Sequence, residues 1–243
     1  MQILSIGNSF SEDATTYLHD MAKLSGKSIT TANLVIGGCS LERHFRNMHS
    51  EAQAYSLHFN GEATGFCVSI KEALLSRAWD VVTLQQASHF SAIPETYTPY
   101  IEQLAAYIRA LCPKAKFVIH QTWAYEEASA RLVNTAKFDS AKAMYEAIVK
   151  AYNTAAEITN ADGLIPSGDI MYRLSTSGVG PVHRDTFHAA FGVGRYALAM
   201  TWLRYLTGAD VSDNTFTDTK EPLTEEQIAT VKKLVSEIVP LGA

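Results

Sequence analysis

The stretch that decides the fold is ILSIGNSFS, residues 3–11. It begins with the apolar run Ile3 to Ile6, which ends at Gly7 and gives way to a helical pattern. A short apolar run that stops at a glycine before a helix is typical of a buried parallel strand. Ser9 stands at the turn from strand to helix. The start of the chain therefore predicts the first strand–helix unit of a parallel sheet.

Outward from this segment, apolar runs alternate with amphipathic stretches along the chain. We predict further strands at 29–36, 80–84, 117–119 and 163–166, a hairpin-like excursion at 54–68, and helices around 17–24, 70–74, 97–111, 138–159, 168–175, 189–206 and 225–238. This alternation, without a linker or repeat, predicts one doubly wound α/β domain over residues 1–243. Ligands of such sheets bind outside the carboxyl ends of the strands. The residues that follow each strand are therefore the candidates for a site.

The composition argues against several classes of function. The chain has 243 residues, is 47% hydrophobic and carries a net charge of -5, and its lysines and arginines are scattered. Nucleic-acid binding, which needs clustered basic residues, is therefore not expected. The three cysteines, Cys39, Cys67 and Cys112, form neither a disulfide framework nor a metal-binding pattern.

The sequence also lacks the patterns of export and membrane insertion. No basic segment followed by an apolar one opens the chain, as a signal peptide requires. No apolar run reaches the ~20 residues that span a bilayer. We therefore expect a cytoplasmic protein without membrane contacts, although a chain trimmed of its export signal would have the same pattern.

Three residues from the two ends of the chain have the chemistry of an acyl-transfer site. Ser9 is a candidate nucleophile, and a serine hydroxyl needs an adjacent base. His188 has the chemistry of that base, and Asp185, three residues earlier, is placed to orient it. Each also has a structural interpretation, because Ser9 with Glu12 fits a helix capping box and Asp185 fits a helix cap. A metal site through His183, Asp185 and His188 is less favoured, since no further ligand cluster stands elsewhere.

Other candidates follow the remaining strands. Gly38 can present a backbone N–H to a ligand, or serve only a tight turn. Gln85 and Gln86 carry amides that can donate to an oxyanion, or form a polar rim at the end of the strand. Gln85, His89 and Trp123 are candidates to line a substrate pocket, with Trp123 as a stacking surface.

The segment 40–68 has no assigned role and is either a lid or part of the pocket wall. Its polar residues are expected to be exposed; they are Arg43, His44, Arg46, Asn47 and His49.

The joint order of these blocks resembles the SGNH (GDSL-like) hydrolase superfamily. GNSFS at 7–11 is similar to its first block, Gly38 to its second, and DTFH at 185–188 to its last. Three longer stretches are similar to the DUF4886 branch; they are IGNSFSEDA (6–14), WDVVTLQQAS (79–88) and HRDTFHAAFGVGRYALAMTW (183–202).

The resemblance implies a flavodoxin-like three-layer α/β/α sandwich with a five-stranded parallel sheet. It implies that Ser9 attacks an ester carbonyl, that His188 moves the proton and that Asp185 orients His188. The oxyanion would be bound by the N–H groups of Ser9 and Gly38 and by a side-chain amide.

The chain departs from the superfamily at its third block. That block usually supplies an asparagine, and here the corresponding place holds QQAS, residues 85–88. We hypothesise that Gln86 is the third oxyanion donor, and Gln85 and Ser88 remain alternatives.

The leading hypothesis is a cofactor-free and metal-free serine esterase acting on a small acyl ester. An O-acetyl group on a carbohydrate is favoured by the habit of the family alone, with His89, Trp123 and Tyr125 lining the pocket. A non-catalytic ligand-binding module and an acyltransferase with the same triad remain alternatives. A flavin- or nucleotide-binding domain is disfavoured, because no G-x-G-x-x-G follows the first strand. The oligomeric state is left open.

Overall fold

The structure, a computed structural model, describes residues 1–239 and centres on one mixed sheet. The strands are β1 (Gln2–Gly7), β2 (Thr30–Val35), β3 (Tyr55–Phe59), β4 (Glu62–Val68), β5 (Val81–Leu84), β6 (Lys116–His120) and β7 (Gly163–Ile165). Their order is β4-β3-β2-β1-β5-β6-β7. β1 lies between β2 and β5, with Leu4 in register with Ala32 and Val82. The predicted α/β class and the predicted strand positions are confirmed.

The expected number of five strands is wrong, because the sheet has seven. The five strands β2-β1-β5-β6-β7 are parallel, in the flavodoxin-like order that the resemblance implies. The hairpin expected at 54–68 supplies the other two, since β3 pairs antiparallel with β2 and β4 with β3. The hairpin gives hydrogen-bond partners to the outer edge of β2, which would otherwise expose unpaired N–H and C=O groups.

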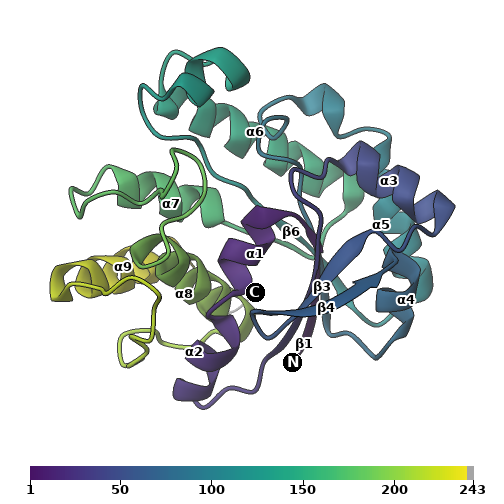
Figure 1. Ribbon diagram of the computed structural model, residues 1–243, viewed down its shortest axis with the longest axis horizontal. Coiled ribbons are helices and arrows are strands. Elements are labelled where there is room, and N and C mark those ends of the chain that lie inside the picture. The colour runs from purple at the N-terminus through teal and green to yellow at the C-terminus, as the bar shows by residue number, and fades with distance from the viewer. Residues whose placement is uncertain (240–243) are drawn as a thin grey trace.

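Helices cover both faces of the sheet. They are α1 (Ser9–Thr15), α2 (Leu18–Leu24), α3 (Leu41–Ser50), α4 (Ile70–Leu75), α5 (Tyr100–Leu111), α6 (Ala141–Thr159), α7 (Ser167–Ser175), α8 (Val193–Thr207) and α9 (Glu225–Ile238). A 3₁₀ turn, η1, spans Pro94–Thr96, and a π-helix, η2, spans Arg131–Ala136. Figure 1 shows α1, α2, α8 and α9 on one side of the sheet and α3, α4 and α5 on the other. The arrangement is the expected three-layer sandwich.

The helix α8 is the core of its layer and supports the segment that carries His188. Its residues are buried from Val193 through Arg204, as expected for a helix enclosed on all sides. Gly194 permits a close contact between α8 and the segment before Asp185, because a Cβ at this position would lie 2.6 Å from the carbonyl oxygen of Val182. Only glycine therefore lets the chain before Asp185 rest directly on α8.

None of the helices within residues 1–239 combines the length and the apolar character that crossing a membrane demands.

Candidate active site

The turn after β1 presents Ser9 at the carboxyl end of the sheet. Asn8 has extended backbone angles, and its Oδ1 accepts a hydrogen bond of 2.9 Å from the N–H of Phe10. Asn8 is thus the N-cap of α1, and Ser9 is the first helical residue. The capping interpretation of Ser9 does not hold, so its hydroxyl is free for another partner.

That partner is His188. The Ser9 Oγ lies 2.8 Å from Nε2 of His188, and Nδ1 of His188 lies 2.7 Å from Oδ2 of Asp185. The other oxygen of Asp185 accepts from the backbone N–H of His188 at 2.9 Å. Partial burial would raise the pKa of Asp185, but the hydrogen bonds from the His188 side chain and backbone outweigh it and lower that pKa. The structure therefore brings the three residues into one hydrogen-bonded line, with a carboxylate at its end.

The turn between Asp185 and His188 is held by contacts to the segment after β6. Thr186 has a φ of 74°, a region that residues with a Cβ seldom occupy. Its carbonyl accepts from the N–H of Glu126 at 2.8 Å. The carbonyl of Phe187 accepts from Nε1 of Trp123, also at 2.8 Å. Two hydrogen bonds thus fix a strained backbone at the site.

The expectation that Trp123 is a stacking surface for substrate is wrong. Its side chain is fully buried, and its ring stacks on that of Phe10 at 4.1 Å between centroids. A ring enclosed in this way offers no face to a ligand. Trp123 instead supports the turn 185–188 through the carbonyl of Phe187.

A buried cluster of charges fastens the same segment to α1. Asp13, which is 0% exposed, accepts two hydrogen bonds from Arg184, at 2.9 and 3.0 Å. It also accepts from Nε of Arg195 at 2.8 Å and from the N–H of Ala189 at 3.0 Å. Because Arg184 and Ala189 flank the turn, Asp13 anchors both of its ends to the helix that carries Ser9.

The turn after β2 brings Gly38 beside the Ser9 turn. Gly38 has a φ of 61°, which glycine adopts without strain. The side chain of Asn8 links the two turns, because its Nδ2 donates to the carbonyl of Cys39 at 3.2 Å. Among residues 1–239, no protein acceptor is recorded for the N–H of Ser9 or of Gly38. Both N–H groups are thus available to an oxyanion.

The hypothesis that Gln86 donates to the oxyanion does not fit its contacts. Its Nε2 donates to the carbonyl and to Oγ1 of Thr96, at 3.0 and 3.1 Å. Its Oε1 accepts from the N–H groups of Leu41 and Ala87, at 3.0 and 2.8 Å. The amide nitrogen is therefore engaged with Thr96 of η1, and the amide oxygen holds the start of α3.

Gln85 turns to the other side and supports the Ser9 turn. Its Nε2 donates to Oδ1 of Asn8 at 2.8 Å, and its Oε1 lies 2.8 Å from Nδ1 of His120. Burial lowers the pKa of His120 to about 3, so the ring is neutral and Nδ1 is the donor. Gln85 is buried and does not face a substrate, so its predicted role in substrate binding is not supported.

The rim of the site on the side of β5 is formed by Ser88, His89 and Tyr125. The Ser88 hydroxyl lies 2.9 Å from the Tyr125 hydroxyl, and both residues are buried. His89 is half-buried, with its ring against Phe90. His89 is the predicted lining residue that keeps access to solvent.

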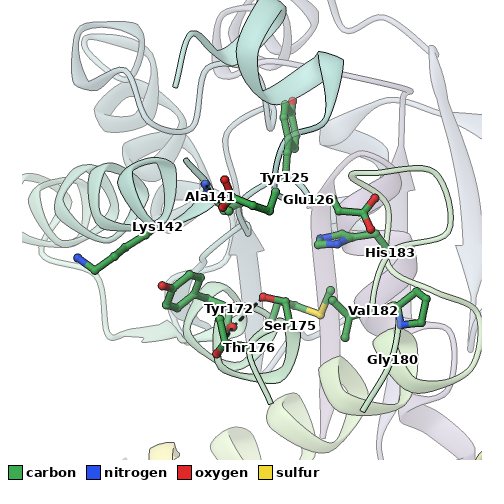
Figure 2. Close-up of a pocket in the computed structure, with 14 residues that line it drawn as sticks. Tyr125, Glu126, Ala141, Lys142, Tyr172, Ser175, Thr176, Gly180, Val182 and His183 are labelled. Carbon is green, nitrogen blue, oxygen red and sulfur yellow. Dashed lines mark hydrogen bonds between the residues drawn. The ribbon is translucent and has the colours of Figure 1, made fainter. Parts of the chain in front are cut away.

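A separate cavity of about 380 Å³ lies against residues 180–183, which precede Asp185. Figure 2 shows it between the segments 124–127, 141–142, 171–176 and 180–183. Ser9, Asp185 and His188 do not line it. The hydrogen-bonded line of these three residues, and not the size of a cavity, therefore identifies the candidate site.

The three residues of the metal interpretation do not converge on one point. His188 directs Nε2 to Ser9, while His183 is buried and lines the separate cavity. No group of three or more potential ligands is assembled within residues 1–239.

The segment 40–68 forms α3 and the β3–β4 hairpin. The expectation of exposure is wrong for His44, which is fully buried. Its Nδ1 lies 2.8 Å from the Tyr55 hydroxyl, and burial lowers its pKa to about 3. Arg43, Arg46 and His49 are exposed, as expected.

The supporting roles of two residues, Asn8 and Asp13, were not predicted from the sequence. Asn8 has the residue type of a helix cap and directly precedes Ser9. Asp13 shares the inner face of α1 with Phe10 and Ala14. A charge at an inward position of a helix is a signal for a buried partner.

Comparison with known proteins places the chain in a family. The family described as "Domain of unknown function (DUF4886)" matches residues 2–234. No curated protein gave a significant match. A DUF4886 family protein from Bacteroides uniformis is 33% identical, with a TM-score of 0.91 over 98% of this chain and 93% of that one.

More distant structures share the fold. A candidate SGNH hydrolase from Slackia heliotrinireducens is 24% identical, with a TM-score of 0.61 over 85% of this chain and 98% of that one. Axe2, an acetylxylan esterase from Geobacillus stearothermophilus, is 14% identical, with a TM-score of 0.51 over 88% and 94%. The chain therefore belongs to the DUF4886 family and has the fold of the SGNH hydrolases.

Proposed function

We propose that this protein is a serine esterase that hydrolyses small acyl esters. The observation that carries the proposal is the continuous line from Ser9 through His188 to Asp185, with separations of 2.8 and 2.7 Å. Nucleophile, base and orienting carboxylate within hydrogen-bond reach are the requirements of acyl transfer through a serine. A module that only binds a ligand has no need of all three.

The hydrogen bonds define how the proton moves. The Asp185 carboxylate accepts from Nδ1 of His188, so the other ring nitrogen, Nε2, carries the lone pair. Ser9 donates its proton to Nε2 as its Oγ attacks the ester carbonyl, forming a tetrahedral intermediate. His188 then returns the proton to the departing alcohol, leaving an acyl group on Ser9. Water, activated by the same histidine, releases the acid.

The developing oxyanion is bound by the N–H groups of Ser9 and Gly38. Asn8 sets the distance between the two turns through its bond to Cys39. Donors fixed before the reaction stabilise the transition state without reorganising during it. Gln86 is not part of the proposed oxyanion hole, since its amide is engaged elsewhere.

The acyl group is proposed to be acetyl, with a small molecule or carbohydrate as the alcohol. Support comes from the fold shared with Axe2, which is an acetylxylan esterase, and from the half-buried His89 at the rim. The reaction requires neither a metal nor an organic cofactor.

Hydrolysis of 4-nitrophenyl acetate by wild type, Ser9→Ala and His188→Ala tests the proposal. Both variants are expected to lose about 10³-fold or more in kcat, because the nucleophile and base act as one unit. Ser50→Ala on the exposed face of α3 is the control and should retain the wild-type rate. A Ser9→Ala variant as active as wild type would place the activity elsewhere.

Covalent labelling covers the case of a pocket too narrow for the nitrophenyl ester. A small fluorophosphonate should add to Ser9 of wild type and not to the His188→Ala variant, as read by peptide mass. A wild-type protein that neither hydrolyses the ester nor is labelled contradicts the esterase function.

A further inference from the structure

Arg131 stands beside the proposed base and has no role in the mechanism above. It is the first residue of η2, and its guanidinium carbon lies 3.8 Å from the centroid of the Phe187 ring. The Phe187 ring centroid lies 3.8 Å from that of His188. The separation of the cation from the His188 ring is thus at most the sum of these two distances. Short π-helical turns are often found at functional sites.

The charge of Arg131 is not balanced by a neighbouring carboxylate. Among residues 1–239, Arg184 and Arg195 pair with Asp13, whereas no acidic group lies within 4.0 Å of Arg131. Arg131 is exposed, so its guanidinium keeps free donors towards solvent. An unpaired guanidinium at the mouth of a site is suited to an anionic group, which it binds through two parallel hydrogen bonds.

Two titratable side chains whose pKa is affected by Arg131, His89 and Tyr125, add no second positive charge. Burial lowers the pKa of His89, and the charge of Arg131 lowers it further, which keeps His89 neutral at pH 7. Burial raises the pKa of Tyr125, the Ser88 hydroxyl and Arg131 lower it in part, and the phenol remains protonated. Of Arg131, His89 and Tyr125, only Arg131 is therefore charged, and the other two are neutral.

The topology indicates which half of an ester faces this charge. Gly38 follows β2 on one side of β1, while His89 and Arg131 follow β5 and β6 on the other. An ester whose carbonyl oxygen lies between the N–H groups of Ser9 and Gly38 then has His188 and Phe187 at its other end. His188 delivers its proton to the departing alcohol, so the alcohol half is the one next to Arg131.

We propose that Arg131 is a specificity-determining residue that binds a carboxylate on the alcohol half of the substrate. The substrate class is then an acyl ester of a hydroxy acid or of an acidic sugar. This inference rests on the proposed esterase function and names the charge of its substrate.

Two acetate esters, one with a free carboxylate on the leaving group and one with that carboxylate methylated, test it. One is 4-acetoxy-3-nitrobenzoate, whose leaving group is anionic, and the other is its neutral methyl ester. Both release a coloured nitrophenolate. Wild type is expected to prefer the anionic ester about tenfold in kcat/KM at low salt, a preference that added salt reduces because it screens exposed charges.

Three variants separate charge from packing. Arg131→Gln should abolish the preference, expressed as the ratio of the two kcat/KM values, and Arg131→Lys should restore part of it. Arg173→Gln, which removes an exposed arginine on α7, should keep the wild-type ratio and its salt dependence. A wild type without preference, or an Arg131→Gln variant that slows both esters equally, overturns the proposal, since only packing on Phe187 would then be involved.

Binding to an inactive variant distinguishes this failure from failure of the esterase function. Ser9→Ala should bind the product 4-hydroxy-3-nitrobenzoate, followed by its absorbance, more tightly than Ser9→Ala/Arg131→Gln does. If wild type hydrolyses neither ester but this difference is found, the anion site holds and the esterase function fails. If both esters are hydrolysed at equal rates and the difference is not found, the esterase function holds and the anion site fails.

Discussion

Asp185 accepts two hydrogen bonds from the same residue, one from the Nδ1 of His188 and one from its backbone N–H. The first fixes which ring nitrogen carries the proton, and the second fixes the orientation of the ring. The lowered pKa of Asp185 keeps it a carboxylate at neutral pH. The residue thus controls both the tautomer and the position of the proposed base.

Asp185→Asn is therefore expected to lower kcat for 4-nitrophenyl acetate by about 10³- to 10⁴-fold. The amide can offer an N–H to Nδ1 and so stabilise the tautomer with a proton on Nε2, which cannot accept from Ser9. The variant should fold normally, because Asp185 is partly exposed. Asp213→Asn, at an exposed position, is the control. A loss below about tenfold would show that Asp185 does not set the tautomer.

Single residues also show the limit of prediction from sequence. Ser9, Asp185 and His188 were identified because each side chain has a distinctive chemistry, and the structure brings them together. Gln85 and Gln86 leave β5 in opposite directions, and neither composition nor periodicity shows which of them faces Ser9. The directions are decided by partners distant in the sequence.

The burial of His44 could have been predicted from the sequence. It shares the inward stripe of α3 with Leu41 and Met48, at a spacing of three and four residues. A polar residue in the apolar stripe of a helix is expected to be buried and to have a polar partner, and here the Tyr55 hydroxyl pairs with Nδ1 of His44.

Among the elements, α1 and the turn 183–189 are joined mainly by Asp13. Besides the hydrogen bond between Ser9 and His188, its contacts to Arg184 and Ala189 link the helix that carries Ser9 to the segment that carries His188, and its contact to Arg195 links that helix to α8. The relative position of these two elements decides whether the nucleophile and its base remain in contact.

Asp13→Asn should lower the free energy of unfolding by about 3–5 kcal/mol, because the buried Arg195 and the partly buried Arg184 lose the charge of Asp13. It should also lower kcat, since the turn loses its anchor on α1. Urea denaturation measures the first effect and 4-nitrophenyl acetate hydrolysis the second.

Asp20→Asn is the matched control for that variant, because Asp20 lies on the exposed face of α2 and its ion pair within residues 1–239 is with Lys23. Its stability should change by less than about 1 kcal/mol. An Asp13→Asn variant as stable as the control would show that the buried cluster does not hold the turn.

The elements themselves were mostly predictable. Apolar runs ending in glycine or polar residues located the parallel strands, and the capping box at Thr224 located α9. The pairing of the 54–68 hairpin with β2 was not predictable, because any free strand edge can accept a new strand. The π-helix η2 was missed because Arg131–Ala136 is short and lacks an amphipathic repeat.

The molecule as a whole buries three histidines in neutral form. Burial lowers the pKa of His44 and of His120 to about 3, and that of His183 to about 4. In the unfolded chain each histidine takes up its proton near pH 6.5. Between these values the unfolded state binds more protons than the folded one, so stability falls as the pH is lowered from about 6.5 towards 4.

We expect the free energy of unfolding to decline as the pH falls through this window. The slope should correspond to the uptake of up to three protons on unfolding. His44→Gln should lower the slope by about one proton, or about 1.4 kcal/mol per pH unit, because one group of the three is removed. Urea denaturation at several pH values gives the slope, which does not depend on the stability at neutral pH.

His49→Gln on the same helix is the control, because His49 is exposed and should leave the slope unchanged. Equal slopes for wild type and His44→Gln would mean that His44 is not buried in neutral form.

The hydrogen bond between Ser9 and His188 joins two residues 179 positions apart in the chain. A nascent polypeptide therefore holds its proposed nucleophile long before the proposed base has been synthesised, and the pair cannot form until the turn 183–189 docks on α1. For the same reason, hydrolysis by this pair would report on contacts between the two ends of the chain. Regain of turnover after dilution from denaturant would time the docking of this turn, which spectroscopic signals from separate helices do not report.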